Sequence, residues 1–235
     1  MDPDPGLVER AAVHAALGDP LRLSIVDELA ISDRTPTELA ARHHVAPNLL
    51  AHHLDVLEDA GGIRRRRCDV DGRRRFVQLR SAAGDIRPAS PSRVLFVCTA
   101  NTARSQLAAA LWRELVGVSA ASAGTEPAAT VHPAARQAAR RCGLSLDAAR
   151  PRRLGRIGRR TQVITVCDQA RRDLGGAGSE AWHWSMPDPV PDGRDAAFDA
   201  VIGELTRRIE PFTRSGGADR WAARPTRWPG DRPAS

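Results

Sequence analysis

Apolar residues recur at helical spacing in three short stretches of the first eighty residues. Residues 19–20 are Asp-Pro, an N-cap followed by proline at the first helical position, and an apolar helical face follows them. Residues 35–38, Thr-Pro-Thr-Glu, have the pattern of a capping box and predict a second helix that ends near Arg42. A third helix is predicted from Pro47 to Ala60, where the glycines at 61–62 end it.

Strand-like residues follow these helices. Ile63–Val70 and Arg73–Leu79 are separated by Asp71-Gly72, a pair that favours a two-residue hairpin turn. Two helices joined by a short turn and followed by a basic hairpin are typical of a winged helix-turn-helix. The first part of the chain is therefore predicted to be a mainly α winged helix-turn-helix domain.

From residue 93 onward, predicted strands alternate with predicted helices. The strands are at 94–97, 118–121, 162–166 and 181–184, and the helices are at 105–115, 132–142 and 194–209. Alternation of this kind indicates a parallel sheet with helices on both faces. We therefore expect a second domain of the three-layer α/β class.

Composition divides the chain in the same way. Residues 81–92 have the Ala, Gly, Pro and Ser content of a linker, which gives a first domain at 1–80 and a second at 93–212. The remaining residues, 213–235, are rich in Arg, Pro and Gly, and we expect them to be disordered.

Net charge does not by itself mark the first domain as a nucleic-acid binder, because residues 1–92 hold 13 arginines and 14 acidic residues. The distribution of charge is more informative. Seven of those arginines lie at 64–67 and 73–75, on the predicted hairpin. The chain contains no lysine and no tyrosine.

The chain has no apolar stretch near 18 residues, and its N-terminus is acidic and rich in proline. We therefore expect a cytoplasmic protein with no membrane partner. Four irregularly spaced cysteines indicate reduced or catalytic thiols, and we expect no bound metal because no Cys-x2-Cys pair occurs. Adjacent histidines, at 43–44 and 52–53, cannot both face one site on a helix.

The candidate chemistry lies where the strand at 94–97 ends. Cys98 is followed by a five-residue loop, then by Arg104, Ser105 and a helix. Strand, tight loop and helix direct backbone N–H groups and a helix dipole at a bound anion, and these donors are expected to lower the pKa of the Cys98 thiol. Cys68 and Arg74 have the same spacing but lack that context, so we interpret Cys68 as an exposed thiol on the wing.

Residues 11–80 resemble the ArsR family of repressors, through residues 17–23, 38–40 and 52–61. The resemblance implies a homodimer that places two copies of the 47–60 helix in successive major grooves of operator DNA. Asn48, Ala51 and His52 would then lie closest to the bases, and Arg73 would reach phosphate or the minor groove. The family's Cys-x-Cys sensor site is absent, so the inducer is not predicted.

Residues 93–210 resemble the low-molecular-weight protein tyrosine phosphatase superfamily, and within it the arsenate reductase branch. The resemblance is carried by residues 98–106, 122–127, 131–133 and 187–189. It implies that Cys98 is the nucleophile, Arg104 the oxyanion clamp and Asp188 the acid that protonates the leaving oxygen. The predicted oxyanion cradle consists of the backbone N–H groups of Thr99, Ala100, Asn101, Thr102, Ala103 and Ser105. Asn101 suits a left-handed backbone position.

Two features separate reductase from phosphatase. Tyrosine phosphatases of this superfamily carry tyrosines after the Asp-Pro pair, whereas this chain has Val190-Pro191 there. Reduction of arsenate needs a second thiol. Cys167 matches the first resolving cysteine of thioredoxin-coupled relatives, but Leu174 stands at the second. Either an external small thiol, mycothiol or glutathione rather than thioredoxin, completes the reaction, or Cys167 is the resolving thiol and forms a disulfide that needs external reduction. The small thiol is the favoured route, and no bound cofactor is expected.

Together these patterns predict a bifunctional transcriptional regulator and arsenate reductase. Two alternatives stay open at this point. One is a low-molecular-weight phosphatase fused to a DNA-binding domain. The other is a non-catalytic repressor that senses an oxyanion.

Overall fold

The computed structural model describes residues 4–80, 87–175 and 180–213. The described residues form two compact units: residues 4–80 and 87–88 with 182–185 form one, and residues 89–175, 180–181 and 186–213 form the other. The predicted linker at 81–92 lies half outside the described residues, and the predicted tail lies outside them except for Thr213.

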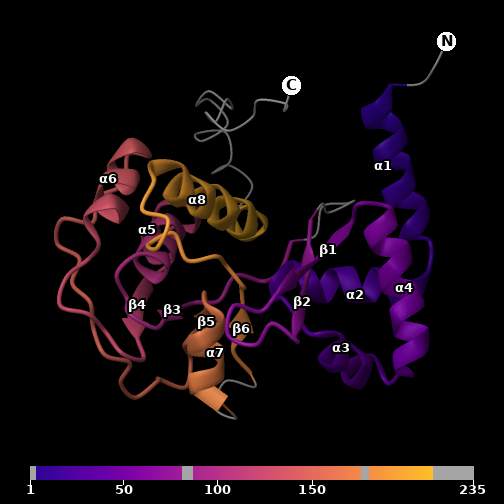
Figure 1. Cartoon of the computed structure of the whole chain (residues 1–235), viewed down its shortest axis with the longest axis horizontal. Helices are drawn as coiled ribbons and strands as arrows, with labels where there is room; N and C mark the ends of the chain where they lie inside the picture. Colours follow the sequence, from indigo (N-terminus) through magenta and orange to yellow (C-terminus); the bar gives the residue numbers. More distant parts are fainter. Residues whose placement is uncertain (1–3, 81–86, 176–179, 214–235) are drawn as a thin grey trace. The chain divides into compact units, whose positions relative to one another are not determined.

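Four helices make up most of the first unit (Figure 1). They are α1 (Pro5–Ala16), α2 (Pro20–Ile31), α3 (Pro36–His43) and α4 (Pro47–Asp59). Asp19 caps α2 by accepting a hydrogen bond from the Arg22 amide at 3.0 Å. The predicted capping box of α3 is present, with the Thr35 and Glu38 side chains each bonded to the other's backbone N–H. Local capping chemistry therefore determines where α2 and α3 begin.

One apolar cluster holds these helices together. Each of α2, α3 and α4 contributes fully buried side chains to it, such as Ile25, Leu39 and Leu54. Burial of an aliphatic side chain of this size contributes roughly 1.5–3 kcal/mol. The helices therefore depend on packing as well as on their caps.

The hairpin of the first unit has shorter strands than predicted. β1 (Ile63–Arg67) pairs antiparallel with β2 (Arg75–Leu79), and Arg67 lies opposite Arg75. The prediction of a two-residue turn at Asp71-Gly72 was therefore wrong. Residues 68–74 connect β1 to β2. Its tip is a turn in which the Arg74 amide donates to the Asp71 carbonyl at 2.9 Å, so Asp71 begins the turn instead of sitting at its centre.

A parallel sheet is the centre of the second unit. β3 (Val94–Cys98) pairs in parallel with β4 (Ala120–Gly124) on one side and with β5 (Gln162–Thr165) on the other. β4 lies two to three residues later than the predicted strand at 118–121, because its register on β3 brings Gly124 opposite Cys98. The short predicted strand at 181–184 is present as β6 (Trp182–His183) and groups with the first unit.

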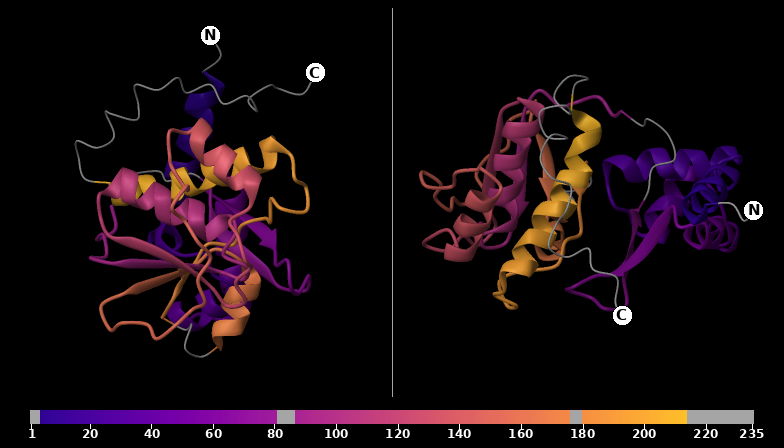
Figure 2. Two further views of the ribbon diagram at one scale, coloured as in Figure 1. Left: turned by 90° about the vertical axis from the view of Figure 1, so that its left-hand side faces the viewer. Right: turned by 90° about the horizontal axis from the view of Figure 1, so that it is seen from above.

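Helices cover both faces of this sheet (Figures 1 and 2). On one face lie α5 (Arg104–Val116), α6 (Pro133–Arg141) and α8 (Asp195–Ile209), followed by a 3-10 turn at Glu210–Phe212. The other face carries α7 (Asp168–Leu174), which the sequence patterns had not predicted. This arrangement confirms the three-layer α/β class.

The core of the second unit lies between β3, α5 and α8. Trp112 of α5 is fully buried and packs against Phe96 and Phe212, with ring centroids 5.8 and 5.1 Å apart. This packing fixes α5 against the end of β3, where Cys98 lies. Among the helices that the structure describes, none is long and apolar enough to cross a membrane.

Candidate active site

Cys98 occupies the last position of β3, and residues 99–103 form the loop that leads to α5. Its side chain is only 3% exposed. The thiol lies 2.9 Å from the Ser105 hydroxyl and accepts a hydrogen bond from the Asn101 amide at 3.2 Å. Strand end, loop and helix start therefore meet around one sulfur atom, as the sequence predicted.

Asn101 supports the loop from within. Its φ of 53° places it in the left-handed region, which confirms the prediction and is rare for a residue other than glycine. The side-chain amide donates to the Ser105 hydroxyl at 2.7 Å, and the side-chain oxygen accepts from Gln106 at 3.1 Å and from the Arg152 amide at 2.9 Å. The role of Gln106 was not predicted.

A second segment supports the loop from behind. The amides of Thr125, Glu126 and Ala128 donate to the carbonyls of residues 98, 99 and 100 at 3.0–3.1 Å. The amide of His132 donates to the Thr102 carbonyl at 3.0 Å. The motifs at 122–127 and 131–133 therefore act through their backbone, by fixing the carbonyl side of the loop.

Gly124 allows this close approach. A Cβ atom at this position would lie 2.5 Å from the Thr99 carbonyl oxygen and 3.0 Å from the Asn101 Cβ. No real Cβ comes that near to backbone, so only glycine fits without displacing the loop. Gly124 lies within the motif at 122–127, but the sequence alone did not indicate this role.

Asp188 reaches this site from a distant part of the chain. The guanidinium of Arg104 donates to the Asp188 carboxylate at 2.9 Å and to the Met186 carbonyl at 3.1 Å. Arg104 is largely buried, whereas Asp188 is exposed. The predicted clamp and the predicted acid are therefore in direct contact.

The expected lowering of the Cys98 pKa is not found. Burial raises the pKa of this thiol, and the neighbouring Cys167 raises it further. Hydrogen bonds from Ser105 and the charge of Arg104 act in the opposite direction but do not outweigh burial. The correction follows from how deeply the sulfur is enclosed, which the sequence could not indicate.

Cys167 lies beside this site and is 2% exposed. Its sulfur is 3.5 Å from the Thr99 hydroxyl and accepts from the Ala170 amide at 3.4 Å, so it caps α7. The structure thus brings the predicted second thiol to the loop that carries the first. Cys142 is buried, and Cys68 is buried too (8% exposed), which corrects the interpretation of Cys68 as an exposed thiol.

The predicted DNA-contacting residues belong to the first unit. Asn48, Ala51 and His52 all lie on the exposed face of α4, and Arg73 is exposed in the hairpin loop. The neighbouring His53 is instead buried, with Nδ1 3.5 Å from the Arg22 guanidinium and 3.6 Å from the Asp19 carboxylate. One face of α4 is therefore free for a partner, while the other is committed to the fold.

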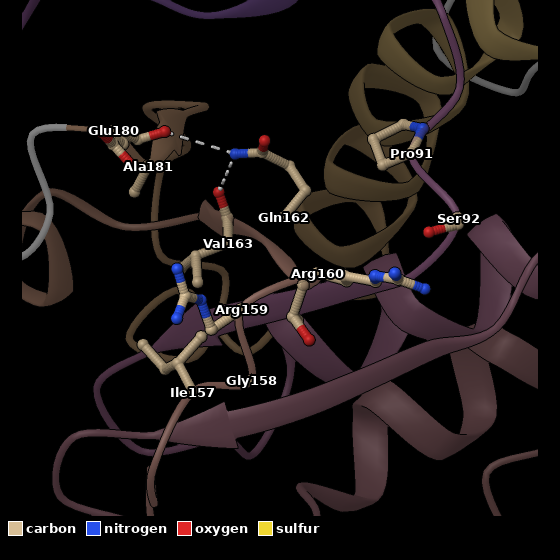
Figure 3. A pocket seen from close by; sticks show the side chains of 11 residues that line it. Pro91, Ser92, Ile157, Gly158, Arg159, Arg160, Gln162, Val163, Glu180 and Ala181 are labelled. Atoms are coloured by element: carbon tan, nitrogen blue, oxygen red, sulfur yellow. Dashed lines mark hydrogen bonds between the residues drawn. The ribbon is translucent and has the colours of Figure 1, made fainter.

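No group of three or more His, Cys, Asp or Glu side chains suited to a metal ion occurs within residues 4–80, 87–175 and 180–213. A pocket of about 690 Å³ lies in the second unit between residues 157–163 and Pro91, Ser92, Glu180 and Ala181 (Figure 3). None of the predicted site residues lines it.

Two family models match the chain. Residues 93–219 match the low molecular weight phosphotyrosine protein phosphatase model, and residues 19–64 match the bacterial regulatory protein model of the arsR family. Among curated proteins no significant match is found.

Solved structures similar to the chain include enzymes of different activity. An arsenate reductase from Archaeoglobus fulgidus DSM 4304 is 27% identical over 50% of this chain and 95% of its own, with a TM-score of 0.44. The YwlE arginine phosphatase from Geobacillus stearothermophilus is 26% identical over 56% and 94%, with a TM-score of 0.45. The tyrosine phosphatase Wzb from Escherichia coli K30 is 22% identical over 57% and 97%, with a TM-score of 0.46.

Proposed function

We infer that this chain, which belongs to the low molecular weight phosphotyrosine protein phosphatase family, uses Cys98 to attack a tetrahedral oxyanion, and that this oxyanion is arsenate. Cys167 beside the loop supports arsenate as the oxyanion, and one observation carries the attack itself. The contact of Arg104 with Asp188 unites clamp and acid beside the loop that begins at Cys98. This contact supports the roles that we propose for both groups in the reaction at Cys98.

The first step displaces an oxygen from arsenic. The Cys98 thiolate attacks As(V), an S–As bond forms, and an As–O bond breaks. Asp188 gives its proton to the departing oxygen, which leaves as water. Arg104 and the amides of the loop hold the remaining oxygens, and an anion in the loop competes with Asp188 for the guanidinium.

The second step transfers the electrons. A second thiolate attacks the Cys98 sulfur, a disulfide forms, and the electron pair of the S–As bond stays on arsenic, which leaves as arsenite. Two thiols are oxidised to one disulfide while As(V) becomes As(III). An external thiol then reduces the disulfide and restores the resting site.

Two sources of the second thiol are compatible with the site. Cys167 is favoured by its contact with Thr99, the residue that follows Cys98, and by the charge effect through which it raises the Cys98 pKa. A small thiol such as mycothiol or glutathione is favoured by Leu174, which stands where a relay would need another cysteine. In either case the external thiol is the final reductant.

A phosphatase is the second candidate, because the same nucleophile, clamp and acid suit phosphate monoesters. Cys98 would form a phosphocysteine, and water would hydrolyse it. The absence of tyrosine from the chain argues against the aromatic pocket of a tyrosine phosphatase, and it leaves other phosphate esters open.

We propose that the first unit binds operator DNA as a homodimer. The exposed face of α4, with Asn48, Ala51 and His52, supports this, as does the exposed Arg73 in the hairpin loop. A gel shift on the promoter of the chain's own gene tests it. We expect a shift at low salt that weakens as salt rises, and its absence at low salt would remove the DNA-binding proposal.

Arsenite formation by the purified full chain tests the enzymatic proposal. We expect product with mycothiol or glutathione as donor and no product from Cys98→Ser. Cys167→Ser separates the two sources of the second thiol, because it abolishes turnover only if Cys167 resolves the intermediate. Rapid release of phosphate from p-nitrophenyl phosphate without any arsenite would favour the phosphatase instead.

A further inference from the structure

Residues 150–160 of the second unit form an arginine-rich segment. It carries arginines at 150, 152, 153, 156, 159 and 160, and residues 148–167 include no Asp or Glu. All six arginines are exposed. Arg150 donates to two backbone carbonyls, whereas the other five make no side-chain hydrogen bond or ion pair with any residue in the described part of the chain. These five guanidinium groups are therefore available to an anion.

Most other described arginines of this unit are engaged by partners. Arg140 pairs with Asp147 at 2.6 Å, for example, and Arg207 pairs with Glu204 at 2.8 Å. The frequency of arginine in the chain therefore does not explain the unpaired group. Uncompensated positive charge is concentrated in one segment of the unit.

The start of this segment pairs with the sheet that carries the candidate active site. The Gly124 amide donates to the Arg152 carbonyl at 2.8 Å, and the Leu154 amide donates to the Gly124 carbonyl at 2.7 Å. Arg153 thereby forms a parallel bridge with Gly124, which lies opposite Cys98 in the register of β4 on β3. The segment thus extends the sheet beside β4, at the edge where Cys98 lies.

This pairing determines how far the two arginines lie from the site. Neighbouring strands are about 4.8 Å apart, so the backbone of Arg153, two strands across from Cys98, is roughly 10 Å away. The Arg152 amide donates to the Asn101 side chain at 2.9 Å, and the Asn101 amide donates to the Cys98 sulfur at 3.2 Å. Charges act over such a distance, because the Debye length is about 8 Å at 0.15 M salt and about 30 Å at 0.01 M.

Two carboxylates lie at the same edge. Asp188 is bonded to Arg104 and cancels its charge. Glu126 is exposed, and its amide donates to the loop that follows Cys98. Without Arg152 and Arg153, these side chains would leave an excess of negative charge beside a site that must admit an anion. With the two arginines the excess is positive.

We propose that Arg152 and Arg153 form an anion-attracting rim of the candidate active site, which draws negatively charged reactants to Cys98 and selects them over neutral ones. The rim acts through its charge and not through contact with the reacting atoms. The proposal rests on the proposed function in one respect, because it takes Cys98 as the reacting thiol.

Two charge-matched double variants of the full chain test the rim. Arg152→Gln/Arg153→Gln removes its charge and leaves the backbone hydrogen bonds intact. Arg159→Gln/Arg160→Gln removes the same charge from the same segment and is the control. Arg159 and Arg160 line the pocket of Figure 3 and precede β5, whose first residue pairs with Val94 at the other end of β3. They therefore lie near the opposite edge of the sheet.

Alkylation of Cys98, followed by mass spectrometry, measures the rim without turnover. Iodoacetate is negatively charged and iodoacetamide is neutral, and both react with the thiolate, so the ratio of their rates does not depend on the pKa of Cys98. At ~0.01 M salt we expect this ratio to fall about threefold in Arg152→Gln/Arg153→Gln and less than about 1.5-fold in the control. The difference should vanish at ~1 M salt. An unchanged ratio, or equal loss in both variants, would overturn the proposal.

Arsenate binding gives a second readout and separates the rim from the proposed function. Calorimetric titration of full-length Cys98→Ser measures binding without chemistry. For a doubly charged anion we expect Kd to rise about tenfold at low salt when Arg152→Gln/Arg153→Gln is added. The same Kd with and without these arginines would contradict the rim. Should arsenate not bind even with the rim intact, the proposed function is in doubt, and the alkylation ratio still decides whether the rim exists.

Discussion

At the scale of single residues, burial and hydrogen bonding compete for the charge of Cys98. Enclosure of the sulfur and the nearby Cys167 raise its pKa, while Ser105 and Arg104 lower it. A raised pKa leaves less thiolate at neutral pH, so the reactivity of Cys98 increases as pH rises through its pKa. An oxyanion held by Arg104 can then react only in those molecules in which Cys98 is a thiolate.

The first prediction follows from the sign of these effects. Cys167→Ala removes one of the causes that raise the pKa of Cys98, so the thiol should ionise at lower pH than in wild type. The pH dependence of Cys98 alkylation by iodoacetamide, followed by mass spectrometry, measures this. Cys142→Ala is the control and should leave the curve in place. If the pH dependence of Cys98 alkylation in Cys167→Ala is unchanged or shifts to higher pH, the prediction is contradicted.

Gly124 gives the second prediction. Gly124→Ala brings a Cβ against the Thr99 carbonyl, so the loop must move and kcat/KM should fall by about 100-fold. The free energy of unfolding should fall by only about 1–3 kcal/mol, as in other overpacked sites. Gly203→Ala, whose Cβ meets nothing within 4 Å in α8, is the control; it should keep full activity and stabilise the helix by about 0.5–1 kcal/mol. Full activity in Gly124→Ala would show that the loop adapts.

Sequence could predict the composition of this site but not its environment. Cys98, Arg104 and Asn101 follow from local spacing, and Asp188 follows from the order of motifs. The pKa of Cys98 depends on burial by residues far along the chain, and the requirement at Gly124 depends on strand register. Neither property is contained in a short stretch of residues.

At the scale of elements, predictions from helix caps and apolar periodicity were correct where these local features decide the structure. Caps determined the starts of α2 and α3, and the apolar stripe determined α4. The predictions of a strand at 118–121 and of a two-residue turn were wrong. The limits of a strand depend on the strand it pairs with, and not only on its own residues. The short helix α7 was missed, since seven residues give too few turns for a periodic pattern.

Helix α8 supplies the third prediction. Burial raises the pKa of Glu204, but the hydrogen bonds and charges of Arg207 and Arg208 outweigh it and bring the pKa to about 2. A lowered pKa stabilises the folded state above the ordinary value of 4.5, and this stability is lost as pH falls toward 2. It amounts to at most about 3 kcal/mol.

Urea unfolding of wild type and Glu204→Gln between pH 7 and pH 2 measures this contribution. We expect the variant to be less stable by a constant amount above pH 5, with the difference vanishing as Glu204 is protonated. A difference that persists at pH 2 would mean that Glu204 acts through packing instead of charge.

At the scale of the molecule, the first unit contains residues from two distant parts of the sequence. A Trp-His-Trp-Ser stretch indicates a short strand, but nothing in it identifies Asp33 or Gln78 as its partners. Gln78 and Arg66 lie on the two strands of the hairpin, so the element expected to meet DNA also holds Ser185.

The central claim is that Cys98 reduces arsenate with a second thiol. Its most direct test is a single turnover, in which arsenate is mixed with reduced full-length protein and one thiol donor, and arsenite and the state of each cysteine are then determined. We predict arsenite in the wild type, with Cys98 in a disulfide to Cys167 or to the donor, and none in Cys98→Ser. Arsenite from Cys98→Ser, or Cys98 still free after arsenite has formed with no more than one equivalent of the donor present, would contradict the account.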